Sequence, residues 1–286
     1  MKRAGVIGHP LGHSLSPAIF QAAFDATGID ARYEAWATTP DELAARVDSL
    51  RADDVLGANV TIPHKETIVA HLDRLDERAE RIGAVNTIAN DGGKLVGYNT
   101  DVAGFDWALR EDAGFDPKGK QTALIGAGGA ARAVALALIE GGASIIYVTG
   151  RSPRRIDALT AKLRGLTSPG ITLTWSYWLA GTFMRVVPNT DLLVNCTPVG
   201  THKSDTDGQS PLPDEYVPGS LVFDLVYNPP ETPLLKVAKK RGAKAVSGLG
   251  MLVYQAAESI KIWTGQDAPV EKMLEAGKQA LAGEGG

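Results

Sequence analysis

The chain has very little cysteine, no long apolar run and no large excess of either charge. Its 286 residues include one cysteine, Cys196, which excludes an internal disulfide and favours a reducing cytoplasm as its location. No apolar run is long enough to cross a bilayer, and the N-terminal residues do not resemble a signal peptide. The formal net charge is -4, so neither nucleic acid nor an anionic membrane is an expected partner.

Metal-ligand spacing is also missing from the sequence. His9 and His13 stand four residues apart, but Pro10 and Gly12 break the segment between them, and the single cysteine lies far away. A zinc site needs ligands that can converge at tetrahedral spacing. We therefore predict no metal site.

The composition that is present suits a globular α/β protein. Hydrophobic residues make up 44% of the chain and charged residues 22%. Apolar, β-branched runs alternate with helical patterns, which predicts parallel sheets covered by helices. Pro17 opens the first predicted helix, with Ser16 as its expected N-cap. Residues 175–191 follow neither the helical nor the strand period, and we assign them no element.

The most informative stretch runs from Gln121 to Arg155. An apolar strand at 122–125 leads into Gly126-Ala127-Gly128-Gly129-Ala130-Ala131, then a helix to Glu140 and a second strand at 145–149. The turn fits the dinucleotide-binding pattern G-x-G-x-x-G/A: one glycine for the tight turn, one for close phosphate approach, and a small residue for helix packing. The helix N-terminus that follows suits a pyrophosphate. This predicts a Rossmann-like, doubly wound dinucleotide-binding domain.

The end of the second strand indicates which dinucleotide is bound. An NAD-binding unit usually carries Asp or Glu about 20 residues after the first glycine. Here Thr149 and Gly150 occupy that place, and Arg151, Arg154 and Arg155 follow. Arginine binds phosphate bidentately, whereas cations in the first turn of a helix oppose its dipole. We therefore predict a 2′-phosphate partner, and hence NADP, although a merely solvated helix start is the alternative.

Two polar clusters stand where core residues would be expected. The first is NVTIPHK (59–65), in which the polar residues alternate along a strand and Lys65 follows its end. The second combines GAVNT (83–87) with GYNTD (97–101), at predicted strand ends, where ligands bind in open α/β sheets. The alternative is that Asn86, Asn99 and Asp101 only cap turns and helices.

Taken together, seven motifs resemble the shikimate dehydrogenase family, in the family's order and almost from end to end of the chain. They are SLSP (14–17), NVTIPHK (59–65), GAVNT (83–87), GYNTD (97–101), GAGGAA (126–131), NCTPVG (195–200) and GLGMLVYQA (248–256). The resemblance implies an NADP-dependent oxidoreductase that interconverts 3-dehydroshikimate and shikimate. It also implies an N-terminal substrate-binding α/β domain (1–103 plus 250–286) and an NADP-binding Rossmann-like domain (104–249), with the ligands meeting between them.

The resemblance assigns roles to individual residues. Lys65 and Asp101 match the catalytic pair, and the serines Ser14 and Ser16 match those that bind the substrate carboxylate. The remaining substrate-binding positions are Thr61, Asn86, Tyr227 and Gln255. The cofactor-binding positions are Gly126, Ala127, Gly128, Gly129, Ala130, Ala131, Arg151, Ser152, Arg155, Thr197, Val199, Gly248 and Met251.

The chain departs from the family's Asn-Arg-Thr turn, because Gly150 replaces the leading Asn. The strength of the preference for NADP is therefore open. So are quinate use, the resting charge of Lys65, the extent of domain closure, and the choice between monomer and homodimer.

Three alternatives compete with this hypothesis. A quinate/shikimate dehydrogenase with relaxed substrate or NAD use would share most of the motifs. A non-catalytic ligand-binding module would not need Lys65, Asp101 and the glycine turn together. A methylene-tetrahydrofolate dehydrogenase fits the fold class only.

Overall fold

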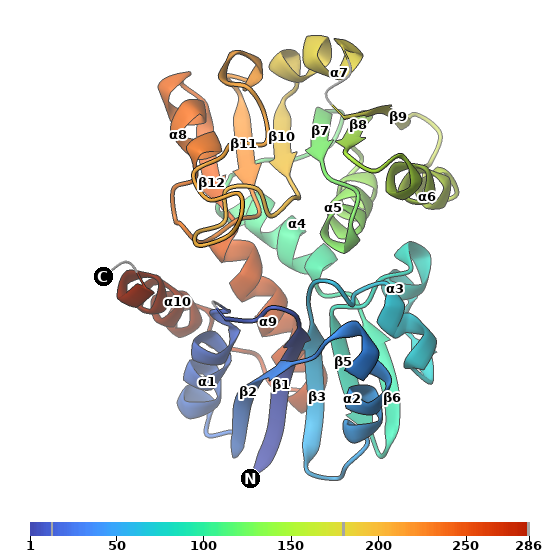
Figure 1. Ribbon diagram of the computed structural model, residues 1–286, viewed down its shortest axis with the longest axis vertical. Coiled ribbons are helices and arrows are strands. Elements are labelled where there is room, and N and C mark those ends of the chain that lie inside the picture. Colours follow the sequence, from blue (N-terminus) through green and yellow to red (C-terminus); the bar gives the residue numbers. More distant parts are fainter. Residues whose placement is uncertain (13, 179–180, 285–286) are drawn as a thin grey trace. The chain divides into compact units, whose positions relative to one another are not determined.

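The computed structural model describes residues 1–12, 14–178 and 181–284. The chain divides into two compact units: unit 1 comprises Met1–Gly104 and Leu252–Gly286, and unit 2 comprises Phe105–Met251. Both divisions fall within helices, α4 (Asp101–Glu111) and α9 (Leu249–Thr264). Each unit is an α/β layer structure with its own sheet (Figure 1), which confirms the predicted fold class.

Unit 1 is built on a mixed sheet. Its strands are β1 (Lys2–Gly8), β2 (Ala31–Ala37), β3 (Val55–Val60), β4 (Arg74–Leu75), β5 (Thr87–Asp91) and β6 (Lys94–Tyr98). Within the described residues they lie in the order β2-β1-β3-β5-β6-β4. β1 runs parallel to β2 and β3, whereas β5 is antiparallel to β3 and β6. β5 and β6 form a hairpin that turns at Gly92 and Gly93.

The helices of unit 1 cover this sheet. Besides parts of α4 and α9, they are α1 (Ser16–Thr27), α2 (Leu43–Ser49), α3 (Glu77–Ile82) and α10 (Val270–Glu284), with 3₁₀ turns at Pro40–Glu42 and Thr67–His71. The C-terminal α10 packs against α1, so the last segment of the chain belongs to the same unit as the first. A core that includes Ile7, Val60, Ile68 and Ile88 is fully or almost fully buried. Burying each such side chain contributes about 1.5–3 kcal/mol.

The start of α1 corrects one prediction. Ser16 is not the N-cap: it is the first residue of the helix, and Leu15 occupies the cap position without a side-chain hydrogen bond. Pro17 still stands in the first turn, as expected. The hydroxyl of Ser16 is therefore not used to cap the helix.

Unit 2 is built on a parallel sheet. Its strands are β7 (Gln121–Ile125), β8 (Ile145–Gly150), β9 (Thr172–Tyr177), β10 (Leu192–Asn195), β11 (Leu221–Asp224) and β12 (Lys244–Ser247). In the described part of the unit they lie in the order β12-β11-β10-β7-β8-β9, and every pair is parallel. The order reverses direction at β7, which is the topological switch point of a doubly wound sheet.

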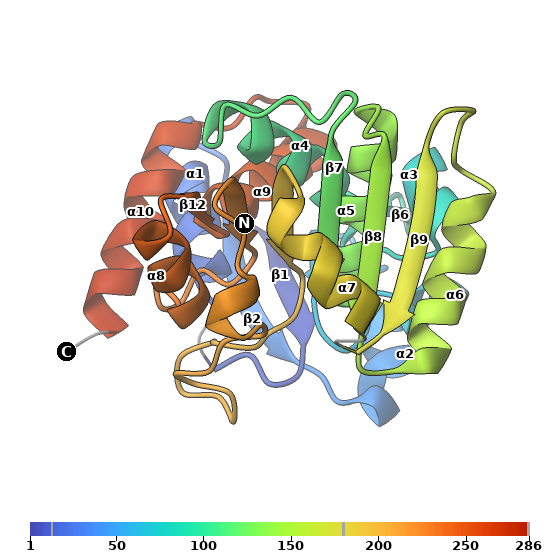
Figure 2. The same ribbon diagram turned by 90° about the horizontal axis from the view of Figure 1, so that it is seen from above.

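Besides parts of α4 and α9, the helices of unit 2 are α5 (Gly129–Glu140), α6 (Pro153–Arg164), α7 (Gly181–Val186) and α8 (Pro233–Lys240), with 3₁₀ turns at Val187–Asn189 and Asp214–Tyr216. Figure 2 shows α6 beside the edge strand β9, against which it packs. β9 and α7 occupy most of the stretch that the sequence left unassigned. Among the described residues, no helix combines the length and apolar character that crossing a membrane requires.

Candidate active site

Lys65 and Asp101 form a short polar contact in unit 1. Lys65 lies in the turn after β3, Asp101 is the first residue of α4, and Lys65 Nζ lies 2.5 Å from Asp101 Oδ2. Their side chains are only 17% and 6% exposed. A partly buried ion pair of this kind holds a lysine ammonium in one place, which suits a group that must meet a reacting atom.

Asn86 connects this pair to α9. Its Nδ2 lies 2.9 Å from Asp101 Oδ1, 2.9 Å from Thr100 Oγ1 and 3.2 Å from Gln255 Oε1. Its Oδ1 accepts a hydrogen bond from the backbone N–H of Thr100 across 2.7 Å. Because an N–H can only donate, this bond fixes the orientation of the amide. The structure thus brings together four of the predicted site residues: Lys65, Asp101, Asn86 and Gln255.

A buried layer of polar residues supports these side chains, and one of its members, Ser259, lies outside the motifs found in the sequence. Ser259 is fully buried on α9, and its Oγ lies 2.9 Å from Thr87 Oγ1 and 3.0 Å from Asn59 Nδ2. It also donates to the carbonyl of Gln255 across 2.9 Å. Ser259 could have been found from its spacing, because it stands four residues after Gln255 and residues four apart share one face of a helix.

Asn59 extends the network towards α1. Its Nδ2 faces the carbonyl of Asn86 at 3.3 Å, which can only accept, so its Oδ1 must face Tyr33. The phenol of Tyr33 therefore donates to Asn59 Oδ1 across 2.8 Å. Burial raises the pKa of Tyr33 well above its usual value, so the phenol stays protonated.

The two serines lie together at the start of α1. Ser14 Oγ accepts a hydrogen bond from the backbone N–H of Ser16 across 3.4 Å. Thr61 lies just after β3, half-buried, with its backbone N–H bonded to Ile7.

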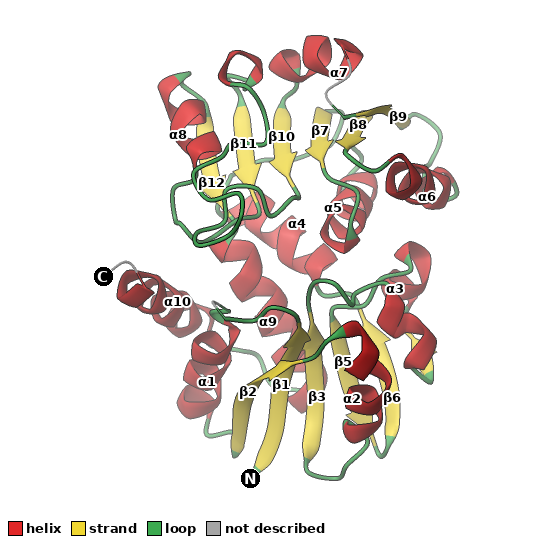
Figure 3. Cartoon of the chain, in the orientation of Figure 1, coloured by secondary structure: helices red, strands yellow, loops and turns green. Residues whose placement is uncertain are grey.

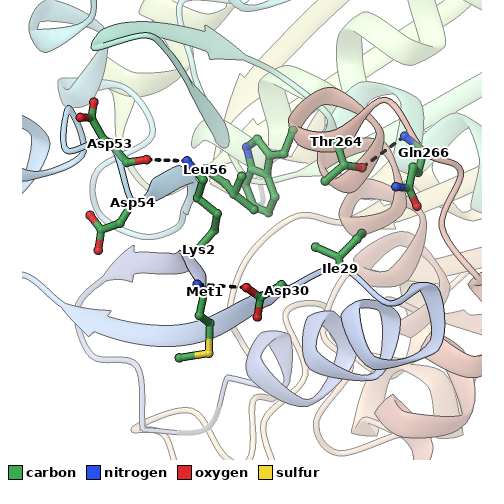
Figure 4. A pocket seen from close by; sticks show the side chains of 10 residues that line it. Met1, Lys2, Ile29, Asp30, Asp53, Asp54, Leu56, Thr264 and Gln266 are labelled. Carbon is green, nitrogen blue, oxygen red and sulfur yellow. Dashed lines mark hydrogen bonds and ion pairs between the residues drawn. The ribbon is translucent and has the colours of Figure 1, made fainter.

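Unit 1 also contains a hollow of about 640 Å³, shown in Figure 4, which does not coincide with these residues. Its lining includes Met1, Asp30 and Asp54, which stand at or just before the amino ends of β1, β2 and β3. Ser14 and Lys65, in contrast, follow the carboxyl ends of β1 and β3. Ligands of open α/β sheets bind at the carboxyl ends, so we do not assign the hollow to the active site.

In unit 2, the glycine turn has the form that a dinucleotide requires. Gly126 has φ +124°, and a Cβ there would lie 3.1 Å from the backbone of Cys196, so only glycine fits. Gly128 is the N-cap of α5, and a Cβ built on it would meet no atom within 4 Å. The space above this helix N-terminus is therefore open to a phosphate. Figure 3 shows the turn leaving the carboxyl end of β7.

The predicted phosphate-binding turn follows β8. Arg151, Arg154 and Arg155 are all exposed, and within the described residues none of them has an ion-pair partner. The Ser152 hydroxyl caps α6 by accepting a hydrogen bond from the Arg155 N–H across 3.4 Å. The three arginines thus lie at the start of α6 with exposed side chains, where an anion could reach them.

The other predicted cofactor residues lie on loops at the carboxyl ends of β10 and β12 and at the start of α9. Thr197 is half-buried and donates to Asn195 Oδ1 across 2.7 Å, and Val199 is 8% exposed. A Cβ on Gly248 would lie 2.1 Å from the Leu225 carbonyl oxygen, so this position also requires glycine. Met251 is buried, and Tyr227 is half-buried after β11.

The described residues hold neither a cluster of metal-ligating side chains nor a reactive thiol. Among residues 1–12, 14–178 and 181–284, no three His, Cys, Asp or Glu side chains are grouped as metal ligands would be. His13, one of the histidines considered from the sequence, lies outside the described residues. Burial raises the pKa of the Cys196 thiol well above its usual value, which makes it a poor nucleophile.

A parallel sheet with a glycine turn at its switch point, together with a lysine–carboxylate pair in a second α/β unit, defines a nicotinamide-dinucleotide oxidoreductase of two units. Family models narrow this class. The model for the shikimate dehydrogenase substrate binding domain matches residues 6–88, and that for the shikimate 5'-dehydrogenase C-terminal domain matches residues 248–276.

Individual relatives agree with the family models. The chain is 45% identical to the shikimate dehydrogenase (NADP(+)) of Moorella thermoacetica, over 98% of this chain and 94% of the relative. It matches the crystal structure of shikimate 5-dehydrogenase from Thermus thermophilus in complex with NADP(H) and shikimate with a TM-score of 0.85 and 39% identity, covering 98% of this chain and 100% of that chain. A quinate dehydrogenase from Corynebacterium glutamicum in complex with NAD matches with a TM-score of 0.86 at 29% identity, over 97% and 99% of the two chains. The chain belongs to the shikimate dehydrogenase family.

Proposed function

We propose that this chain catalyses the reversible, NADPH-dependent reduction of 3-dehydroshikimate to shikimate, a step in chorismate and aromatic amino-acid biosynthesis. The main observation behind the proposal is the contact between Lys65 and Asp101. Asn86 supports this contact by donating a hydrogen bond to the other carboxylate oxygen of Asp101. Unit 1 would bind the substrate, apart from a contribution from Tyr227, and unit 2 would bind the dinucleotide. The chain's relatives are named for this activity and this cofactor.

Lys65 is the proposed proton donor. As the ring ketone is reduced, its oxygen gains negative charge, which an ammonium group at hydrogen-bond distance stabilises. Lys65 then gives its proton to that oxygen, and the reverse reaction returns it to the neutral amine. Asp101 holds Nζ through Oδ2, while its Oδ1 is bonded to Asn86.

The remaining polar residues of unit 1 would select the substrate. Asn86, Gln255 and Thr61 offer amide and hydroxyl groups to the ring hydroxyls. A site that pairs such hydroxyls rejects analogues that lack them, because its own buried polar groups would stay unpaired. Ser14 and Ser16 would bind the substrate carboxylate at the start of α1, where the helix dipole favours an anion.

The glycine turn and the arginines fit NADP(H). When bound, its nicotinamide supplies or accepts the hydride. The open space at Gly128 suits the pyrophosphate, and Arg151 and Arg155 suit the 2′-phosphate. Thr197, Val199, Gly248 and Met251 would hold the nicotinamide end.

The lone cysteine suits a reducing compartment, and we propose that the enzyme works in the cytoplasm, as a monomer or homodimer. The test is purified protein with shikimate and NADP⁺, followed by NADPH absorbance, with quinate and NAD⁺ in parallel assays. Lys65→Ala should lower kcat by about 10²–10⁴-fold. Lys272→Ala, which removes an exposed lysine of α10, is the matched control and should leave kcat unchanged.

Each result of these assays distinguishes the proposal from one of its alternatives. Turnover with shikimate and NADP⁺, lost in Lys65→Ala, supports the proposal. Faster turnover with quinate or NAD⁺ would contradict the assigned substrate or cofactor, while the catalytic role of Lys65 could still stand. Binding of shikimate without any turnover would instead make this chain a ligand-binding module.

A further inference from the structure

A buried carboxylate in unit 2 is not used by the proposed chemistry. Asp224, at the carboxyl end of β11, has no exposed surface. Its Oδ1 accepts from Asn195 Nδ2 across 2.9 Å and from the Val226 N–H across 3.1 Å, and its Oδ2 accepts from Thr232 Oγ1 across 2.7 Å. All three partners are neutral, and burial raises the pKa of Asp224 to about 6. Burying a charge without a cationic partner costs free energy, so a carboxylate in such a place is expected to have a function.

The first group that Asp224 holds is the loop after β10. Asn195 is fully buried, and its Oδ1 accepts from the Thr197 N–H across 3.0 Å, a group that can only donate. Its Nδ2 must therefore face Asp224 and the Val199 carbonyl, at 3.5 Å. Asp224 thus fixes the amide that ties Thr197 and Val199 into one turn.

The second group is the loop after β11. Asp224 accepts from the Val226 N–H and from Thr232, whose Oγ1 in turn caps α8 by accepting from the Leu235 N–H across 3.3 Å. The carbonyl of Val226 accepts from the Gly248 N–H across 3.2 Å. The segment that carries Tyr227 is therefore anchored at both ends by Asp224 and connected to Gly248.

We propose that Asp224 is a positioning residue for the nicotinamide end of the dinucleotide site, which it organises by holding the loops after β10 and β11 in one arrangement. The inference rests on the proposed use of NADP(H), because Thr197, Val199 and Gly248 are the proposed contacts. Asp224 touches no ligand itself and acts through Asn195 and Val226.

The test measures NADPH binding to the purified full-length chain by fluorescence titration, alongside the KM values for NADP⁺ and shikimate. Asp224→Ala removes the acceptor of all three hydrogen bonds, and we expect the Kd for NADPH and the KM for NADP⁺ to rise at least about tenfold, with a smaller rise in the KM for shikimate because the loop after β11 also carries Tyr227. Asp224→Asn retains an acceptor for both Asn195 and Val226, so it should bind NADPH within threefold of the unmodified chain. Asp191→Ala, at the amino end of β10, is the matched control and should not change the Kd.

A second variant tests the same coupling without Asp224→Ala, should that variant fail to fold. Asn195→Ala removes the amide that connects Asp224 to Thr197 and Val199, and it should raise the Kd for NADPH at least about tenfold. Unchanged NADPH binding in a folded Asp224→Ala or Asn195→Ala protein would overturn the inference.

The proposed function and this inference fail in different ways. If the unmodified chain binds NADPH but does not oxidise shikimate, the proposed reaction is wrong while the Kd comparison still decides the role of Asp224. If the unmodified chain does not bind NADPH, both are wrong.

Discussion

Asn86 and Asp101 lie 2.9 Å apart, amide nitrogen to carboxylate oxygen, on a strand end and a helix start that are 15 residues apart in the chain. Because Asn86 occupies Oδ1, Lys65 is left with Oδ2. Asp101 thus binds the amide of Asn86 through one carboxylate oxygen and the amine of Lys65 through the other. The position of Lys65 Nζ is therefore determined by residues that extend back to α9.

The first prediction concerns this carboxylate. Asp101→Asn removes the charge that holds Lys65, and a hydrogen bond to a charged group contributes about 1.5–3 kcal/mol, so kcat should fall roughly 10–100-fold. Asp106→Asn, an exposed carboxylate of α4 paired with Arg110, is the control for helix α4 and should keep kcat. Steady-state assays with shikimate and NADP⁺ check both. A kcat unchanged in Asp101→Asn would show that Lys65 needs no anionic partner.

The second prediction concerns the buried layer. Ser259→Ala leaves Asn59 and Thr87 short of a partner, which should cost about 1–3 kcal/mol of unfolding free energy and raise the KM for shikimate severalfold, without changing the KM for NADP⁺. The control is Thr264→Val. It removes a hydrogen bond from a side chain to the carbonyl four residues earlier on α9, as Ser259→Ala does, but it touches none of the buried polar residues around Asn86. Urea unfolding of both variants measures the free energy of unfolding, and their initial rates give the KM values. Equal effects of the two substitutions would contradict a special role for Ser259.

Much of this fold could be predicted, because strands and helices with one buried face carry a clear period. The stretch around β9 could not. β9 is an edge strand whose residues are mostly half-exposed on both faces, so no alternation of apolar and polar residues marks it. The helix α7 that follows is too short, at six residues, to show a helical period.

The residues of the candidate site also fall into two groups, those that the sequence predicts and those that only the fold reveals. Lys65, Asp101 and Asn86 come from motifs that local sequence makes visible, and the structure brings them together. Ser259 lies 200 residues from Asn59, so only the fold shows that they touch. The N-cap prediction for Ser16 is wrong because Leu15 adopts that position and Ser16 is already the first residue of the helix.

The third prediction concerns the dinucleotide preference. Arg151→Ala or Arg155→Ala should lower kcat/KM for NADP⁺ roughly 10–100-fold, since each removes a charge-assisted bond to the 2′-phosphate. Values for NAD⁺, which lacks that phosphate, should stay within twofold. Arg154→Ala, in the same turn but outside the family pattern, should have the smallest effect. Equal losses with both dinucleotides would mean that the arginines stabilise α6 rather than select the cofactor.

The fourth prediction concerns pH. Burial raises the pKa of Asp224 from 3.8 to about 6, so its protonated form favours the folded state, and stability is lost as the pH rises through about 6. The nearby titratable group is the Cys196 thiol, whose pKa is raised by burial and by Asp224, and it stays neutral throughout this range. Asp224→Asn should therefore gain about 2 kcal/mol relative to the unmodified chain between pH 4 and pH 7.5. Urea unfolding at both pH values measures this, and a difference independent of pH would show that Asp224 keeps its ordinary pKa.

The fifth prediction separates two glycines of one turn. A Cβ at Gly128 meets no protein atom, so Gly128→Ala should fold normally while its methyl group occupies the space proposed for the pyrophosphate. The Kd for NADPH should rise at least about tenfold, because backbone N–H groups and phosphate can no longer approach closely. Gly126→Ala places a side chain at φ +124° and 3.1 Å from Cys196, and should instead lower stability by about 1–3 kcal/mol. Thermal denaturation and NADPH titration of the two variants should therefore give opposite patterns. Normal NADPH binding by Gly128→Ala would mean that the phosphates do not approach the N-terminus of α5.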